Sequence, residues 1–487
     1  MGQLFLEASW FSLLARPGEH YFGRKEGRGV IVMADKDYSY CVIGAGPAGL
    51  AAAKNLKQWD IPVEVIERED DIGGNWYFGK PYSSVCSSTH LITSKRFSEY
   101  TDFPMPERYP TYIHHSLVLE YLRSYARAFG LYDNIRFNQS VTRVEPAEGG
   151  KYWDVTLESG ETRRYRGVLI ANGHGWDPNL PSYPGYFNGL SMHSSRYKTP
   201  DVLKDKRVLV VGAGNSGCDV AVESSHHAAL TFHSTRRGYY YWPKYLFGIP
   251  SDEWAEISLA LHVPLWMRRF FGKLILPMFT AGRPERYGVP KPDHKLFETH
   301  YILNSTLLYH IDHGDVIPKP DVLQLLGDQV LFKDGTREQI DVIIHATGFN
   351  ISFPFIDTRH LNWKQGRPDW YLNVFHPDYD NLFLIGLFQT STGFFPLMDH
   401  QSQLVARFLY ALEHDVRKAD WLKSQKVRTQ PNIRGGITYT GASRHRIECE
   451  HYSYRSQLKR HIAKIAMDRP RSVRLPLATP QPVSVEK

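Results

Sequence analysis

Two glycine-rich turns have the residue spacing that binds the diphosphate of a dinucleotide. Both follow the pattern G-x-G-x-x-G, with Gly44, Gly46 and Gly49 in the first turn and Gly212, Gly214 and Gly217 in the second. The first glycine of such a turn allows a tight bend, the second lets the backbone approach the diphosphate, and the third lets a helix pack on a strand. The helix that follows offers unpaired N–H groups and its positive end to the phosphates. Two such turns predict two nucleotides in one chain, with hydride transfer between them.

The residues that end the next strand of each unit predict which nucleotide binds. In the first unit the strand "PVEVIE" ends in Glu67, whose carboxylate can accept hydrogen bonds from a ribose 2′-hydroxyl. In the second unit the strand "AALTFHS" is followed by Thr235, Arg236 and Arg237. Arginine side chains at that place would bind a ribose phosphate that a carboxylate would repel. The first site therefore suits FAD or NAD and the second suits NADP(H), unless the two arginines are only solvated charges.

The elements around the two turns predict an α/β protein. Each turn lies between a short apolar strand, residues 40–43 or 207–211, and a helix. We predict two Rossmann-like dinucleotide-binding domains with parallel sheets, and chemistry in the crevice between them. The NADPH-binding domain, residues 201–334, is predicted to be inserted in a discontinuous FAD-binding domain made of residues 37–200 and 335–467. In the second turn, Asn215 and Ser216 suit a diphosphate or a helix cap equally well.

The two ends of the chain are predicted to lie outside these domains. Residues 1–36 are interpreted as an N-terminal extension that is either disordered or the product of a mis-annotated start, with Met33 as the alternative first residue. The proline-rich residues 468–487 predict a disordered C-terminal tail. No run of about 18 apolar residues is present, so no membrane span is predicted. The apolar segment Trp254–Phe279 is interpreted as a membrane-surface helix or, as we favour, a lid over a substrate channel, which leaves peripheral membrane contact open.

Composition argues against several other kinds of site. The net charge of +7 is not concentrated in one basic tract, so no nucleic-acid partner is predicted. The four cysteines form no C-x-x-C pair, which predicts no metal site and a reducing compartment, here taken as the cytoplasm. A homodimer is left open.

Motifs outside the glycine turns resemble those of the flavin-containing monooxygenases. "FNGLSMHSSRYK", which contains Tyr197, is similar to the F-x-G-x-x-x-H-x-x-x-Y fingerprint of that family and lies just before the second turn. "IDVIIHATGF" resembles the family's A-T-G-[YF] segment. The other matching segments are "REDDIGGNWYFG", which holds Gly74 and Trp76, and the segment from Asn381 that holds Gln389 and resembles the one passing the flavin ring. A secondary resemblance is to the plant flavin monooxygenases of auxin synthesis.

This resemblance implies an FAD- and NADPH-dependent monooxygenase of the N,N-dimethylaniline monooxygenase type. NADPH reduces FAD, O₂ adds to the flavin as a C4a-hydroperoxide, and a small soft nucleophile takes one oxygen atom at nitrogen or sulfur. The resemblance places Gly74, Trp76 and Gln389 at FAD and Tyr197 at NADP, although Trp76 and Tyr197 could instead be core residues. The alternatives are Baeyer–Villiger oxidation, oxidative decarboxylation of a 2-oxo acid, and an uncoupled NADPH oxidase.

One position departs from the family's pattern. Members carry an asparagine near the flavin, three residues before a basic residue, and counting back from Lys95 places Ile92 there. An aliphatic side chain cannot donate a hydrogen bond, so the support must come from other residues or be weaker. His90, Thr93 and Ser94 are the nearby polar candidates, and no catalytic residue is assigned beyond them.

Overall fold

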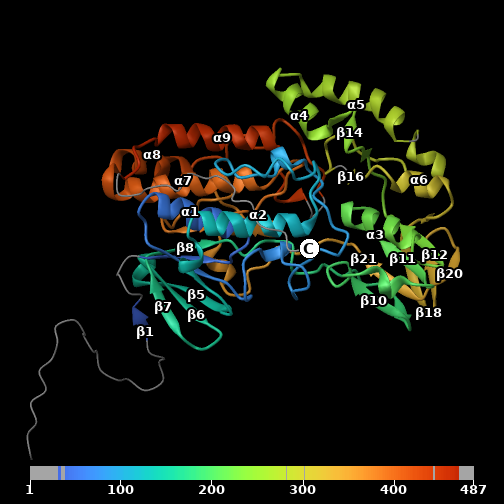
Figure 1. Cartoon of the computed structure of the whole chain (residues 1–487), viewed down its shortest axis with the longest axis horizontal. Coiled ribbons are helices and arrows are strands. Elements are labelled where there is room, and N and C mark those ends of the chain that lie inside the picture. The colour runs from blue at the N-terminus through green and yellow to red at the C-terminus, as the bar shows by residue number, and fades with distance from the viewer. Residues whose placement is uncertain (1–30, 34–38, 281, 301, 442–444, 471–487) are drawn as a thin grey trace, which may run out of the picture.

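The computed structural model describes residues 31–33, 39–280, 282–300, 302–441 and 445–470. Figure 1 shows two α/β units next to each other, with a pair of helices above them. The predicted N-terminal extension lies outside the described residues except for strand β1 (Ile31–Met33), which pairs in parallel with β7 (Thr162–Tyr165). The predicted tail beyond residue 470 also lies outside them.

The first unit is built on a parallel five-stranded sheet in the order β24-β8-β2-β3-β4. The strands are β2 (Tyr40–Ile43), β3 (Val63–Ile66), β4 (Ile135–Arg136), β8 (Gly167–Ile170) and β24 (Leu382–Leu384). The chain leaves β2 toward β3 and later returns to the other side of β2 as β8. This reversal opens a crevice beyond the carboxyl end of β2, where the first glycine turn begins.

Helices hold the first turn against the rest of this unit. They are α1 (Pro47–Gln58), α2 (His115–Ala128), α7 (Phe395–His414), α8 (Val416–Lys426) and α9 (His451–Lys464). The alanines of α1 are buried, and their small side chains let α1 pack closely against α7. Lys54 of α1 is also buried and pairs with the buried Asp399 of α7 at 2.9 Å. A helix from the far end of the chain therefore fixes the helix that follows the turn.

The second unit is built on a parallel sheet in the order β10-β21-β11-β12-β17. Its strands are β10 (Leu190–His193), β11 (Arg207–Val211), β12 (Leu230–Ser234), β17 (Ile317–Lys319) and β21 (Val342–His345), and its helices are α3 (Asn215–Ser225) and α6 (Leu307–Asp312). Because β24 comes after β21 in the chain and joins the first sheet, the second unit is an insertion in the first. The predicted fold class is confirmed.

The sheet of the second unit extends beyond the segment predicted for it. β10 precedes residue 201 and β21 follows residue 334, and both pair directly within this sheet. The chain thus enters and leaves the second unit through strands that lie side by side. The domain limits given above stay a prediction.

Smaller sheets and short strand pairs complete the two units. The first unit adds β5 (Val141–Ala147) and β6 (Tyr152–Leu157) beside β7. The second adds β9 (Gly185–Phe187), β18 (Val322–Gly327), β19 (Gln329–Phe332) and β20 (Arg337–Gln339). The short pairs are β13 (Tyr241–Trp242) with β16 (Ile302–Leu303), β14 (Tyr245–Leu246) with β15 (Ile249–Pro250), and β22 (Trp363–Lys364) with β23 (Arg367–Pro368).

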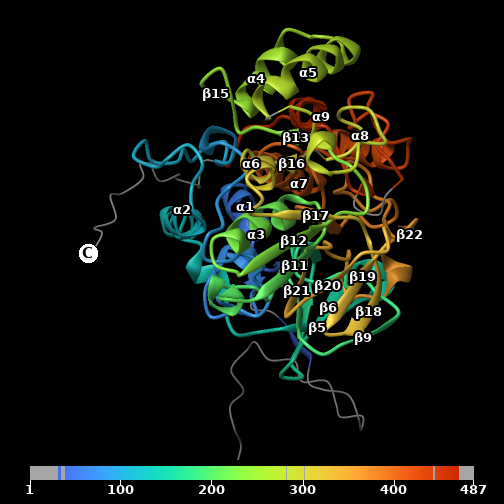
Figure 2. The ribbon, with the colours of Figure 1, turned by 90° about the vertical axis from the view of Figure 1, so that its right-hand side faces the viewer.

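The apolar segment Trp254–Phe279 lies in a helical hairpin that stands above the two units in Figure 2. It comprises α4 (Ser251–Ala260) and α5 (Leu265–Phe279), which begins after Pro264. His262 between them has a φ of +53°, which breaks the helix. Among the described residues, no helix combines the length and apolar character needed to cross a membrane.

Candidate functional site

A cavity of about 650 Å³ opens beside the second glycine turn. Six of the residues predicted for NADP line it, namely Gly212, Gly214, Asn215, Ser216, Arg236 and Arg237. Ile92, Gln389 and His445, which are contributed by the first and last parts of the chain, line the same cavity. The cavity therefore lies between the two units, where the sequence predicted the reaction. We call it the nucleotide cavity.

The second turn has the close approaches that its glycines permit. An added Cβ at Gly217 would lie 1.9 Å from the carbonyl oxygen of Gly212, so α3 packs directly on the turn. A Cβ at Gly214 would instead meet open space. Gly214 also precedes α3 without any side-chain cap, and the Asn215 side chain accepts a hydrogen bond from the N–H of Leu303 at 2.8 Å. The start of α3 is thus open toward the nucleotide cavity, as a diphosphate site requires.

Arg236 and Arg237 differ in the contacts that their side chains make with the rest of the protein. Arg237 pairs with Asp293 at 2.6 Å and lies over the ring of Tyr239. Arg236 is exposed, lines the nucleotide cavity, and has no ion pair or hydrogen bond to any residue that the structure describes. Thr235 is buried, and its N–H donates to the carbonyl of Lys319 at 3.0 Å, which ties β12 to β17. Arg236 is therefore the side chain most open to a ribose phosphate.

Tyr197 lies in the core of the second unit and not in the cavity lining. Its buried hydroxyl donates to Glu223 of α3 at 2.5 Å, and this carboxylate helps to raise the pKa of Tyr197 after the larger effect of burial. His193 of the same motif donates from Nε2 to the carbonyl of Gly348 at 3.0 Å. The motif thus links the segment by which the chain enters the second unit to the segment by which it leaves. Tyr197 does not line the nucleotide cavity, so its contact with NADP stays a prediction.

The first turn has the same close packing and a buried acid beneath it. A Cβ at Gly49 would lie 1.8 Å from the carbonyl oxygen of Gly44, and one at Gly74 would lie 3.0 Å from Cα of Gly46. Two stretches of bare backbone therefore meet at this turn and form a cradle that side chains would fill. Trp76 is half-buried against the core of this unit. These residues fit a dinucleotide whose diphosphate lies on the backbone of the turn.

Glu67 is already engaged with the first turn. Its carboxylate accepts hydrogen bonds from the N–H of Ala45 at 2.5 Å and of Glu69 at 3.0 Å. Burial raises the pKa of this carboxyl, and the two N–H donors oppose that rise. Each carboxylate oxygen can accept a further bond, so Glu67 can orient the turn and still receive a ribose hydroxyl.

Of the residues considered near the flavin, Ile92 and Gln389 line the nucleotide cavity and the three polar candidates do not. His90 is exposed and donates to the carbonyl of Ser88 at 2.8 Å. The hydroxyls of Thr93 and Ser98 lie 2.7 Å apart, and the N–H of Ser94 donates to Asp252 at 2.7 Å. Catalytic roles for these three residues stay a prediction. Of the described residues 90–94, only the aliphatic Ile92 lines the nucleotide cavity.

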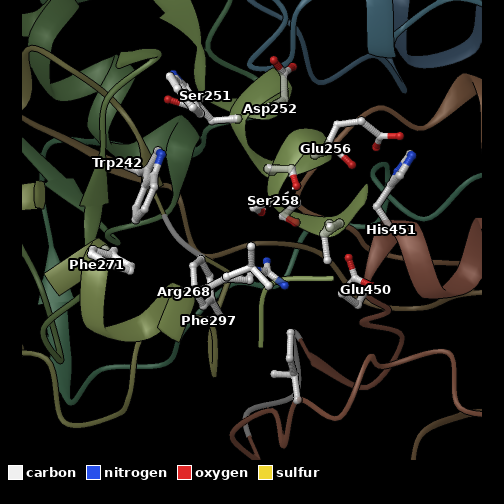
Figure 3. Close-up of a pocket in the computed structure, with 18 of the residues that line it drawn as sticks. Trp242, Ser251, Asp252, Glu256, Ser258, Arg268, Phe271, Phe297, Glu450 and His451 are labelled. Atoms are coloured by element: carbon white, nitrogen blue, oxygen red, sulfur yellow. Dashed lines mark hydrogen bonds between the residues drawn. The ribbon is translucent and has the colours of Figure 1, made fainter. Parts of the chain in front are cut away.

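A second cavity, of about 390 Å³, lies beneath the α4–α5 hairpin, and we call it the apolar cavity. Figure 3 shows Trp242 and Phe271 on one side of it and Glu256, Glu450 and His451 on the other. Two further segments contribute to its wall, so the cavity joins the hairpin to the segment beside Gln389. The lining residues of these segments are Ser391, Thr392, Ile437, Tyr439, Glu448, Glu450 and His451. The sequence indicated only the side of this cavity that the predicted lid forms, because the other side comes from segments about 200 residues away.

Carboxylates dominate the charged part of the apolar cavity. Among its described lining residues there are four, Asp252, Glu256, Glu448 and Glu450, and one permanently charged cation, Arg268. Burial raises the pKa of Asp252. Glu256 pairs with Arg455, and Glu450 accepts N–H bonds from the start of α9. The cavity thus combines aromatic side chains with four carboxylates in its wall. Among the described residues, no group of three or more His, Cys, Asp or Glu side chains could hold a metal ion.

Comparisons with known proteins agree with this geometry. The family model described as Flavin-binding monooxygenase-like matches residues 38–467. Flavin-containing monooxygenase 5 of Rattus norvegicus is 34% identical over 396 residues, which cover 76% of this chain and 73% of that protein. Dimethylaniline monooxygenase [N-oxide-forming] 2 of Pan troglodytes is 34% identical over 391 residues, with 76% and 73% covered.

A solved structure shows the same fold. Cyclohexanone monooxygenase from Rhodococcus sp. Phi1, bound to NADP⁺, superposes with a TM-score of 0.64 at 19% identity and covers 88% of this chain and 98% of that one. At this identity the likeness concerns the fold alone.

Proposed function

Because the chain belongs to the flavin-binding monooxygenase-like family, we propose that it oxygenates a soft nitrogen or sulfur nucleophile of a small organic substrate, using NADPH and O₂. Family membership confirms the predicted enzyme class, an FAD-dependent monooxygenase, and its cofactors, FAD and NADPH. The kind of substrate and the route through a C4a-hydroperoxyflavin belong to the proposal.

One observation carries the proposal: the apolar cavity and the nucleotide cavity are neighbours, since His300 lines both. A substrate held between the aromatic side chains of Trp242 and Phe271 would therefore lie next to the region between the two nucleotide-binding units. The four carboxylates in the wall of the apolar cavity favour a neutral or cationic substrate over an anionic one. This charge supports nitrogen or sulfur oxygenation over decarboxylation of a 2-oxo acid.

The chain's own residues supply binding, orientation and exclusion of water. The cradle of Gly44, Gly46, Gly49 and Gly74 would hold FAD, and the open start of α3 with Arg236 would hold NADPH. Bound FAD supplies the activation of oxygen. The apolar side chains of this cavity would limit the access of water and protons to the reacting atoms, which would limit the loss of activated oxygen as hydrogen peroxide.

The direct test separates oxygenation from oxidase activity. The purified yellow protein is reduced with NADPH in the absence of air and then mixed with O₂, with and without a tertiary amine or a thioether. Formation of an N-oxide or S-oxide, with NADPH consumption that rises with substrate, supports the proposal. Stoichiometric hydrogen peroxide without product would instead identify an uncoupled NADPH oxidase, the alternative that Ile92 keeps open. An ester formed from a ketone would identify Baeyer–Villiger chemistry.

The outer face of α5 supports peripheral contact with an anionic lipid surface as a further part of the proposal. Trp266, Phe270, Leu274 and Met278 follow one another at every fourth residue and are each more than 60% exposed. Lys273 on the same helix is also exposed. An apolar stripe with a neighbouring cation is typical of a helix that lies in a membrane interface. The other face of α5 lines the apolar cavity. We therefore keep both interpretations of this segment, the membrane-surface helix and the lid over a substrate channel. The dimeric state and a cytoplasmic location stay predictions.

Replacing both Trp266 and Phe270 with glutamate should weaken vesicle binding. We expect the bound fraction to fall at least about tenfold on vesicles with anionic lipid, because two large apolar side chains no longer enter the interface. Co-sedimentation measures it. The control is Leu323→Glu on β18, since Leu323 is an exposed apolar residue away from the hairpin. Equal binding by wild-type protein and the double variant would contradict a membrane role.

A further inference from the structure

Two polar side chains in the wall of the apolar cavity are buried without a hydrogen-bond partner. His451 is 4% exposed and Thr392 is 6% exposed, and both line this cavity. Figure 3 shows the His451 side chain on the same side of the cavity as Glu256 and Glu450. Within the described part of the chain, nothing bonds either ring nitrogen of His451 or the hydroxyl of Thr392. Leaving such groups unbonded costs free energy, which a ligand with matching polar atoms would recover.

Backbone pairing brings these two residues into one wall. Gln389 and Glu448 pair in an isolated parallel β-bridge, and the N–H of Cys449 donates to the carbonyl of Gln389 at 2.8 Å. Thr392 follows its side of the bridge by three residues, and His451 follows the other side by three residues. Both segments run in the same direction, so both residues reach the cavity beyond the bridge. The bridge places them there without using their side chains.

The His451 ring is uncharged at neutral pH. Its pKa is lowered to about 3, first by burial and then by the neighbouring Arg455 and His400. A neutral imidazole has one N–H that donates and one nitrogen that accepts, and the hydroxyl of Thr392 can do either. The two side chains therefore match an uncharged group that both donates and accepts, such as a hydroxyl.

The four carboxylates of this cavity already have partners in the protein. The pairs are Asp252 with Ser94, Glu256 with Arg455, Glu448 with His300, and Glu450 with Ser453. The carboxylates can still repel an anion, but a cation would compete with the partners that they hold. Recognition of a polar group on the substrate therefore depends on the two uncharged side chains.

We propose that His451 and Thr392 select a substrate with a hydroxyl group on an otherwise apolar body. This inference rests on the proposed function and narrows it to alcohols that also carry the soft nitrogen or sulfur atom. The hydroxyl bonds His451 and Thr392, while the aromatic side chains of Trp242 and Phe271 hold the apolar body. An apolar analogue would leave the two buried polar groups unbonded, and an ammonium analogue would meet carboxylates that already have partners.

The test compares three benzyl methyl sulfides in the holoenzyme. They carry a hydroxymethyl, an ethyl or an aminomethyl group in the para position, so their shapes are nearly the same. In the wild type we expect kcat/KM for sulfoxide formation to be at least about tenfold higher for the hydroxymethyl compound than for the other two. His451→Phe should remove this preference by raising KM for the hydroxymethyl compound about tenfold with little change in kcat, because it removes a binding contact.

Conservative and matched variants separate recognition from structure. His451→Gln keeps a donor and an acceptor and should keep most of the preference, whereas Thr392→Val should reduce it about threefold. The control is Thr390→Val, which should leave the preference unchanged. The hydroxyl of Thr390 is also buried without a partner among the described residues, but Thr390 lines neither cavity.

Two results would overturn the proposal. One is a wild type that shows no preference for the hydroxymethyl compound, and the other is an equal loss for all three sulfides in His451→Phe and Thr392→Val. Flavin content and melting temperature show which variants are folded and loaded, and Thr392→Val carries the test if His451→Phe is not. If the wild type converts none of the three sulfides to a sulfoxide, the proposed function itself fails, which is a different result.

Discussion

Gly217→Ala is expected to abolish NADPH-dependent reduction of the flavin, whereas Gly214→Ala should leave the chain folded. The Cβ added at Gly217 would lie 1.9 Å from the backbone oxygen of Gly212 and 3.3 Å from Cβ of Ala346. Backbone atoms cannot move aside as a flexible side chain can, so α3 must separate from β11 and the turn must open. The Cβ added at Gly214 meets open space. That space is the nucleotide cavity, and the methyl group would occupy the path of the diphosphate.

Measurements on both variants distinguish damage to the fold from damage to the site. For Gly217→Ala we expect a melting temperature lower by several degrees and no detectable reduction by NADPH. For Gly214→Ala we expect a melting temperature within about 2 °C of wild type, unchanged FAD content, and an NADPH dissociation constant raised at least about tenfold. The assignment of the second turn to NADPH would be wrong if Gly214→Ala bound NADPH as the wild type does.

The sequence predicted the fold because the signals for it are local. A strand, a G-x-G-x-x-G turn and a helix occupy about 20 consecutive residues, and the close packing of the third glycine on the first occurs within the same residues. At the first turn, for example, a Cβ added at Gly49 would lie 1.8 Å from the carbonyl oxygen of Gly44. The strands β10 and β21 carry no such signal. They pair with each other across about 150 residues, so their place in the second sheet could not be predicted from either segment alone.

The sequence indicated lining residues of the nucleotide cavity only where a motif marks them, in and after the second turn and at Ile92 and Gln389. Arg236 was predicted because it follows a strand at a fixed distance from a glycine turn, but the ion pair that occupies Arg237 comes from Asp293, more than 50 residues away. His300 and Glu448 are 148 residues apart and belong to no recognisable pattern. Tyr197, in contrast, belongs to a recognisable motif, but its hydroxyl donates a hydrogen bond to Glu223 in the core of the second unit. A motif gives the identity of a residue, and tertiary contacts decide what its side chain reaches.

Arg236→Ala is expected to raise the dissociation constant for NADPH about thirtyfold or more while leaving that for NADH within about twofold. A charge-assisted hydrogen bond contributes roughly 1.5–3 kcal/mol, and a forked pair from one guanidinium reaches the upper part of that range. NADH has no 2′-phosphate, so it loses nothing when the guanidinium is removed. Arg237→Ala should have a smaller effect, about threefold, because Asp293 already holds that side chain at 2.6 Å and offsets its charge.

The comparison of the two arginines also tests the geometry of the cavity. Binding of each nucleotide is followed by the change in flavin absorbance at several salt concentrations, since an exposed ionic contact weakens as salt rises. Asp293→Asn releases Arg237 without removing a cation, and we expect it to tighten NADPH binding slightly and to enlarge the loss caused by Arg237→Ala. If Arg236→Ala weakens NADPH and NADH by the same factor, the guanidinium acts on the fold or on the diphosphate, and selection for NADPH must come from another residue.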